Sequence, residues 1–125
     1  MRICIPTEGR GGLDDYVCEH FGRAASFTIY DTETGEVEVI PNTSEHFGGF
    51  GKPPEIIAKT GADVVICGNM GPRAILMLQQ LGIKVYSGAS GRVRDVIRLF
   101  REGKIAEASL ETACKEHRHP IDFWR

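Results

Sequence analysis

Three evenly spaced glycines in the second half of the chain constrain its fold more than any other feature. Gly61, Gly82 and Gly103 follow one another at intervals of 21 residues, and each comes shortly after an apolar segment of helical character. Glycine in such a place suits the positive φ angle that closes a helix. Nothing else repeats strongly at this spacing, so the glycines predict two successive strand–helix units and not a solenoid.

Apolar periodicity on both sides of these glycines predicts the order of the elements. Residues 26–32 and 36–40 alternate with a period of two around Thr34-Gly35, which is typical of an antiparallel hairpin. We expect Phe27 and Ile29, with Val37 and Val39, on one side of this hairpin. The other expected strands are 2–6, 62–67 and 83–86, and the expected helices are a short one through 56–58, then 72–81 and 93–100.

This order predicts one α/β domain, with a five-stranded mixed sheet flanked by about three helices. Residues 1–103 form the predicted domain, and residues 104–125 form a tail that is expected to be partly helical or disordered. If the second strand is antiparallel, the carboxyl ends of the other four strands share one edge with its start. The irregular loops then gather at this edge, where open α/β sheets bind their ligands.

Composition excludes several classes of protein. The formal charge of −2 argues against a nucleic-acid binder that relies on bulk positive charge. The longest strongly apolar run, residues 64–67, is far too short to cross a membrane, and no targeting segment precedes the first strand. The four cysteines contain no Cys-x-x-Cys pair and are read as reduced thiols. We therefore expect a cytoplasmic protein that binds neither nucleic acid nor membrane.

Two Gly-x-x-Gly turns are the first candidate for a binding site. Gly68-Asn69-Met70-Gly71 and Gly88-Ala89-Ser90-Gly91 each follow a strand and open a helix. Such turns let backbone N–H groups face an anion at a helix amino end, although a single turn of this kind is more often only a tight connection. Arg73 and Arg92 stand where a cation opposes the helix dipole unless an anion offsets it.

Other motifs give little support for catalysis. Gly51-Lys52 does not belong to a Walker A motif, because His46 stands where glycine is needed and Pro53 where serine or threonine is needed. Gly48, Gly49 and Gly51 do not form a dinucleotide-binding pattern either. No carboxylate pair converges for hydrolysis, and no Ser/His/Asp order stands out. We therefore predict that the chain is not an enzyme.

Histidine and cysteine side chains near the loops are candidate metal ligands. His20, His46 and Cys67 lie in or beside these loops, and imidazole and thiolate suit transition metals or metal–sulfur clusters. Taken singly, Cys67 is more often a small buried hydrophobe and each histidine a hydrogen-bonding residue. Cys4 is assigned to the core. In the tail, Cys114, His117 and His119 form a Cys-x-x-His-x-His cluster that either chelates a soft metal or belongs to a frayed terminus.

Several segments in this order resemble the dinitrogenase iron–molybdenum cofactor biosynthesis family, which includes NifX- and NafY-type proteins and the carboxyl-terminal domain of NifB. The resemblance covers residues 1–103 and is carried by His20-Phe21-Gly22-Arg23-Ala24, Phe27-x-Ile29-x-Asp31, the glycine-rich loop 42–52, Val65-Ile66-x-Gly68-x-Met70-Gly71-Pro72-Arg73-Ala74 and Gly82-Ile83-Lys84-Val85-Tyr86. It implies a ribonuclease-H-like fold without nuclease activity, and a role in holding iron–molybdenum cofactor or its precursors. Relatives outside nitrogen fixation carry other metal–sulfur clusters, one of them a molybdenum–copper sulfide held largely without covalent ligands.

The resemblance therefore implies a small non-catalytic carrier with cluster donor and acceptor proteins as partners, either monomeric or weakly homo-oligomeric. The alternatives are a metal-free regulatory or partner-binding module and a small enzyme acting on a phosphate substrate. A thiometallate cluster is a soft anion, so we expect an electropositive, sulfur-friendly hollow. The residues expected to bind it are His20, Arg23, His46, Gly48, Gly49, Gly51, Cys67, Gly68, Met70, Gly71, Arg73, Gly88, Gly91 and Arg92, with Cys67, His20 and His46 as direct metal ligands.

Overall fold

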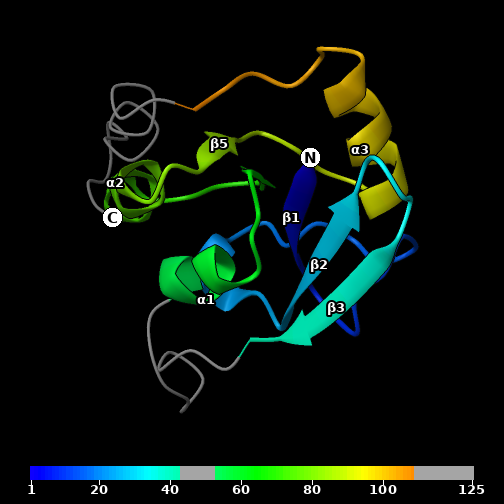
Figure 1. Ribbon diagram of the computed structural model, residues 1–125, viewed down its shortest axis with the longest axis horizontal. Coiled ribbons are helices and arrows are strands. Elements are labelled where there is room, and N and C mark those ends of the chain that lie inside the picture. Colours follow the sequence, from blue (N-terminus) through cyan, green and yellow to red (C-terminus); the bar gives the residue numbers. More distant parts are fainter. Residues whose placement is uncertain (43–52, 109–125) are drawn as a thin grey trace, which may run out of the picture.

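The structure is a computed structural model that describes residues 1–42 and 53–108 (Figure 1). Its strands form one five-stranded mixed sheet in the order β3-β2-β1-β4-β5. The strands are β1 (Arg2–Thr7), β2 (Ser26–Asp31), β3 (Val37–Pro41), β4 (Val64–Ile66) and β5 (Lys84–Tyr86). The helices are the short 3₁₀ helix η1 (Phe21–Arg23), α1 (Pro53–Lys59), α2 (Pro72–Gln80) and α3 (Val93–Arg101). The predicted α/β class and order of elements are confirmed.

Strand directions bring the connecting loops together. β2 is antiparallel to both β1 and β3, whereas β4 is parallel to β1 and β5 is parallel to β4. The carboxyl ends of β1, β3, β4 and β5 therefore share one edge of the sheet with the start of β2, as the sequence predicts. We call this the carboxyl edge.

The helices cover both faces of the sheet, so the domain has three layers (Figure 1). One apolar cluster joins α1 and α2 to the face that carries Cys4 and Phe27. A second joins α3 to the opposite face, which carries Ile3 and Ile5. Alternation along β1 sends successive side chains into different layers, and burial of both sides stabilises the sheet from each face. No helix in residues 1–42 and 53–108 is long and apolar enough to cross a membrane.

The three evenly spaced glycines have the backbone conformation that the sequence predicts. Gly61, Gly82 and Gly103 have φ angles of 78°, 81° and 75°. Each follows the end of a helix, α1, α2 and α3 in turn. An L side chain would be strained at such angles, so these positions fix where each helix ends and the chain turns.

The expected facing of the hairpin is wrong on one strand. Val37 pairs with Tyr30 and Val39 pairs with Thr28. Directly paired residues project from the same face, so both valines lie opposite the face that buries Phe27. Each is 39% exposed. Alternation gives the period within each strand, but the connection between the strands sets their register, and a shift of one residue reverses the face.

The start of the tail lies along the edge strand of the sheet. Residues 104–108 run beside β5, where Glu107 forms an isolated bridge with Tyr86. The Ala108 N–H donates to the Val85 carbonyl at 2.8 Å, and Ala108 is buried in the apolar cluster under α1 and α2. The remainder of the tail, with Cys114, His117 and His119, lies outside the described residues.

Candidate functional site

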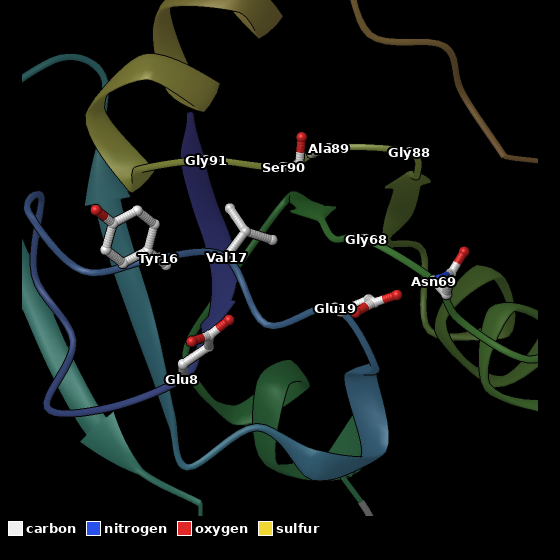
Figure 2. A pocket seen from close by; sticks show the side chains of 10 residues that line it. All are labelled: Glu8, Tyr16, Val17, Glu19, Gly68, Asn69, Gly88, Ala89, Ser90 and Gly91. Carbon is white, nitrogen blue, oxygen red and sulfur yellow. The ribbon is translucent and has the colours of Figure 1, made fainter.

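A hollow of about 380 Å³ opens at the carboxyl edge, and we call it the glycine hollow (Figure 2). It lies where the chain leaves β1, β4 and β5, the three adjacent parallel strands. Its lining consists of Glu8, Tyr16, Val17, Glu19, Gly68, Asn69, Gly88, Ala89, Ser90 and Gly91. Both Gly-x-x-Gly turns therefore contribute to one cavity.

The two glycine turns are held together by direct backbone hydrogen bonds. The Gly88 N–H donates to the Gly68 carbonyl at 2.8 Å, and the Ala89 N–H donates to the Cys67 carbonyl at 3.0 Å. These contacts continue the β4–β5 pairing beyond the last strand residues. The turns form one continuous wall of the hollow, as expected from two neighbouring parallel strands.

The loop that follows β1 closes the hollow from the other side. The Asn69 N–H donates to the Glu19 carbonyl at 2.7 Å, and the Phe21 N–H donates to the Asn69 carbonyl at 3.1 Å. His20 thereby forms a bridge with Asn69. Farther along, the Val17 N–H donates to the Gly91 carbonyl at 2.9 Å. His20 and both glycine turns lie on the same side of the molecule, which the predicted site requires.

The glycines of the hollow are needed for two different reasons. A Cβ atom on Gly68 would lie 2.7 Å from the Glu19 carbonyl oxygen and 3.0 Å from the Glu19 Cα atom. Gly68 therefore permits a close approach of two backbones. At Gly88 and Gly91 a Cβ atom would meet nothing within 4 Å, but their φ angles are 86° and 103°. Gly88 and Gly91 are therefore needed for their positive φ angles, and open space lies beside them.

A chain of buried hydroxyl groups anchors the long loop beside the hollow. The Thr7 and Ser26 hydroxyl oxygens are 2.6 Å apart, and the Ser26 hydroxyl donates to the Gly9 carbonyl at 2.7 Å. The Thr28 hydroxyl accepts the Gly12 N–H at 3.0 Å. Thr7, Ser26 and Thr28 are all buried. Buried polar groups with partners make a stiff attachment, because breaking one bond leaves an unsatisfied group.

Asp15 organises the same loop, although no sequence motif marks it as a candidate site residue. Its carboxylate accepts the N–H groups of Gly9, Gly11 and Tyr16 at 3.0, 2.7 and 2.7 Å. Its backbone carbonyl accepts the Val93 N–H at 2.9 Å. Asp15 therefore ties the loop that supplies Glu8 and Tyr16 to the first turn of α3. An aspartate shortly after a glycine-rich run is the only sequence signal for such a role.

The amino end of α3 is not available to an anion in the way that the sequence suggests. The Val93 N–H donates to Asp15, and the Arg94 N–H donates to the Leu13 carbonyl at 3.0 Å. These protein carbonyls take the first donors of the helix. A ligand at this helix end therefore cannot use the Val93 and Arg94 N–H groups, and its binding to the preceding glycine turn stays a prediction. Gly71, the N-cap of α2, does not line the hollow.

Backbone N–H groups of the hollow itself are available instead. Among residues 1–42 and 53–108, no protein acceptor is found for the N–H groups of Glu19, Gly68, Ser90 and Gly91. All four residues line the hollow. Backbone donors that lack protein partners are suited to hydrogen-bond a bound ligand with acceptor atoms.

The charge of the hollow differs from the expected positive charge. Among residues 1–42 and 53–108, its lining contains the carboxylates of Glu8 and Glu19 and no lysine, arginine or histidine. The Arg92 guanidinium lies over the Tyr16 ring, 5.4 Å from its centroid, and 4.0 Å from an Asp14 carboxylate oxygen. Arg92 thus contacts the lining residue Tyr16 but does not itself belong to the described lining. The expectation of an electropositive hollow is wrong for these residues.

The cysteine thiols lie beneath the surface. Cys67 is fully buried in an apolar cluster, where its Sγ atom donates to the Tyr86 carbonyl at 3.7 Å, and Met70 is 2% exposed. Burial, more than the nearby Glu8 and Glu19, raises the pKa of Cys18. Among the described residues, no three His, Cys, Asp or Glu side chains are grouped so that they could hold a metal ion. Coordination by a preformed ligand set is therefore not evident there.

The remaining predicted site residues divide into two groups. His20, Arg23 and Arg73 are exposed and belong to the first loop or to α2, but they do not line the glycine hollow. The residues predicted from the second glycine-rich loop, His46, Gly48, Gly49 and Gly51, lie outside the described residues.

The fold and the site define a small α/β protein with a glycine-framed binding hollow at the carboxyl edge of its sheet. The chain belongs to the dinitrogenase iron–molybdenum cofactor family, whose model matches residues 1–103. Among curated proteins, it is 34% identical over 110 residues to an uncharacterized protein of Methanocaldococcus jannaschii, covering 84% of this chain and 89% of that protein.

Two solved structures share both the fold and considerable sequence identity with this chain. The apo form of the orange protein from Desulfovibrio gigas is 36% identical, with a TM-score of 0.79 over 86% of this chain and 92% of that one. A putative NifB protein from Thermotoga is also 36% identical, with a TM-score of 0.71 over 85% of this chain and 91% of that one. The described fold is therefore shared with these two proteins.

Proposed function

We propose that this chain is a non-catalytic carrier that holds a metal–sulfur cluster, or a precursor of one, in the glycine hollow during cofactor assembly. Membership of the iron–molybdenum cofactor family supports a role in cofactor assembly. The observation that carries the proposal is the meeting of two Gly-x-x-Gly turns around backbone N–H groups without protein acceptors. Cluster donor and acceptor proteins are the partners that such a carrier needs.

The donor set of the hollow suits a sulfide-covered cluster. Sulfide atoms on a cluster surface accept hydrogen bonds, and the N–H groups of Gly68, Ser90 and Gly91 are suitable donors. The Ser90 hydroxyl and the Asn69 amide, which also line the hollow, add two polar side chains. The described residues thus favour a cargo held by shape and hydrogen bonding over one held by thiolate or imidazole ligands.

Uptake of metal by the anaerobically purified protein tests the proposal. We expect the chain, supplied with molybdate, sulfide and ferrous iron, to take up metal stoichiometrically and to develop visible absorption. The variant Ser90→Trp fills the hollow and should lose this uptake. The matched variant Thr34→Trp should retain it. Thr34 lies on the exposed β2–β3 turn, at the edge of the sheet opposite the carboxyl edge.

Two results would count against the carrier. If the native chain takes up no metal and stays colourless, no cluster is held under these conditions of supply. If Ser90→Trp loads as well as the native chain, the cargo is held away from the glycine hollow. Elemental analysis after gel filtration distinguishes bound metal from free metal in both cases.

A further inference from the structure

Two unpaired carboxylates stand in the wall of the glycine hollow (Figure 2). Glu8 follows β1, and Glu19 ends the stretch of loop that crosses the glycine turns. Both residues are exposed, and within residues 1–42 and 53–108 neither side chain has a hydrogen bond or an ion pair. Their negative charge is therefore not neutralised by a described neighbour.

The nearby arginines contact other groups and form no ion pair with either glutamate among the described residues. Arg92, which follows directly on the lining residue Gly91, is held by Tyr16 and Asp14. Arg94 is also hydrogen-bonded to Asp14, through its Nε atom at 3.0 Å. An anion that enters the hollow meets neutral N–H donors together with two carboxylates. Its Coulomb repulsion grows with its own net charge, whereas its hydrogen bonds do not need that charge.

Both carboxylates act at the same place in the fold. Cys18 lies in the loop between them, and the charges of Glu8 and Glu19 both contribute to raising the pKa of its thiol, after the larger effect of burial. The positive charge of Arg23 acts on the same thiol and lowers its pKa, with a smaller effect than either glutamate. The two glutamate side chains thus reach a common region beside the hollow, where Arg23 offsets their charge only in part.

We propose, on the basis of the proposed function, that Glu8 and Glu19 determine the charge selectivity of the hollow. They disfavour a free thiometallate anion and admit a cluster whose sulfide charge is compensated by bound metal cations. The hollow therefore prefers a cluster of low net negative charge to the more highly charged free thiometallate. The glutamates act on the cargo by their charge, while the backbone N–H groups supply the hydrogen bonds.

Titration with tetrathiomolybdate, a soft dianion, tests the selectivity. At low salt the double variant Glu8→Gln/Glu19→Gln should bind it about tenfold more tightly than the native chain, since two unit repulsions at several ångströms are removed. The control Glu33→Gln/Glu36→Gln removes the same charge from the β2–β3 turn and should stay within about twofold of native. Added salt should strengthen binding to the native chain and have less effect on the Glu8→Gln/Glu19→Gln variant.

A second titration with tetrathiomolybdate and ferrous iron together measures the preference itself. The native chain should favour the iron-compensated species, and Glu8→Gln/Glu19→Gln should lose most of that preference. Equal affinities of the native chain and this variant for tetrathiomolybdate would overturn the selectivity and leave the carrier function standing. Failure of every variant to bind either species would overturn both proposals. Circular dichroism tests whether the variants fold, and among the described residues neither carboxylate has a hydrogen bond or an ion pair to lose.

Discussion

Replacing Gly68 by alanine tests how the hollow is built. The added methyl group would lie 2.7 Å from the Glu19 carbonyl oxygen, 3.0 Å from the Glu19 Cα atom and 3.2 Å from the Cys18 carbonyl oxygen. All three are backbone atoms, so no flexible side chain can move aside. The loop must shift, and overpacking of this kind typically costs about 1–3 kcal/mol.

The shift also weakens the hydrogen bonds that join the loop to the turn. The Asn69 N–H bond to Glu19, now 2.7 Å, and the Phe21 N–H bond to Asn69, now 3.1 Å, would lengthen. A backbone hydrogen bond contributes about 0.5–1.5 kcal/mol net. We therefore expect Gly68→Ala to lower the free energy of unfolding by about 2–4 kcal/mol, from overpacking together with weakened bonds.

The matched control is Gly88→Ala in the second turn. A methyl group there meets open space, and only the positive φ angle of 86° opposes it. That conformation costs an alanine about 1–2 kcal/mol. Guanidinium denaturation, with the same slope for both variants, compares the two losses. If Gly68→Ala is as stable as the native chain, or no less stable than Gly88→Ala, close backbone contact at Gly68 is not what holds this wall.

The remaining predictions concern the loop, a buried thiol and the start of the tail. Asp15→Asn should lower the free energy of unfolding by about 2–4 kcal/mol, because three N–H groups lose a charged acceptor. The control Asp14→Asn removes only an exposed ion pair and should lower the free energy of unfolding by less than about 1 kcal/mol. Similar losses in urea denaturation would refute the role of Asp15. Burial raises the pKa of Cys4 far above its ordinary 9.0, so above pH 9 only the unfolded chain ionises there and stability falls. Between pH 8 and pH 10 the free energy of unfolding of the native chain should therefore fall by about 1.4 kcal/mol relative to that of Cys4→Ala. A difference that does not change with pH would contradict the burial of the thiol. Ala108→Asp places a charge in an apolar cluster and should lower the melting temperature by several degrees, whereas an unchanged value would mean that residues 104–108 do not contribute to the core.

Features set by local chemistry could be read from the sequence. Helix ends at Gly61, Gly82 and Gly103 depend on one backbone angle, and the apolar periods around them depend only on neighbouring residues. Strand directions then followed from the order of elements, and they brought both Gly-x-x-Gly turns to one edge. The location of the hollow was therefore predictable to the level of the loops that form it.

The chemistry inside the hollow depends on contacts between residues far apart in the chain. Arg92 is expected from the sequence to face a ligand, but its contacts are with Asp14 and Tyr16, which the first loop brings to it. The donors at the start of α3 are taken by Asp15 and Leu13 for the same reason. Sequence spacing contains no signal for such encounters. Among the described residues the hollow is lined by two carboxylates, where the sequence predicts a positive site.

The facing of individual side chains was equally hard to foresee. Val37 and Val39 alternate as a strand should, but only the register with β2 decides which layer they join. Cys67 stands one residue beyond β4, where its alternation places it in the core cluster and not in the hollow. A period identifies two faces and does not say which one meets the ligand.

Amide chemical shifts of the protein before and after loading test the central claim most directly. With cluster bound, the N–H resonances of Glu19, Gly68, Ser90 and Gly91 should show the largest changes and slower exchange with solvent, because they donate to the cargo. The N–H groups of the β2–β3 turn should stay unchanged. If loading shifts other amides and leaves these four as they were, the cluster is not held in the glycine hollow.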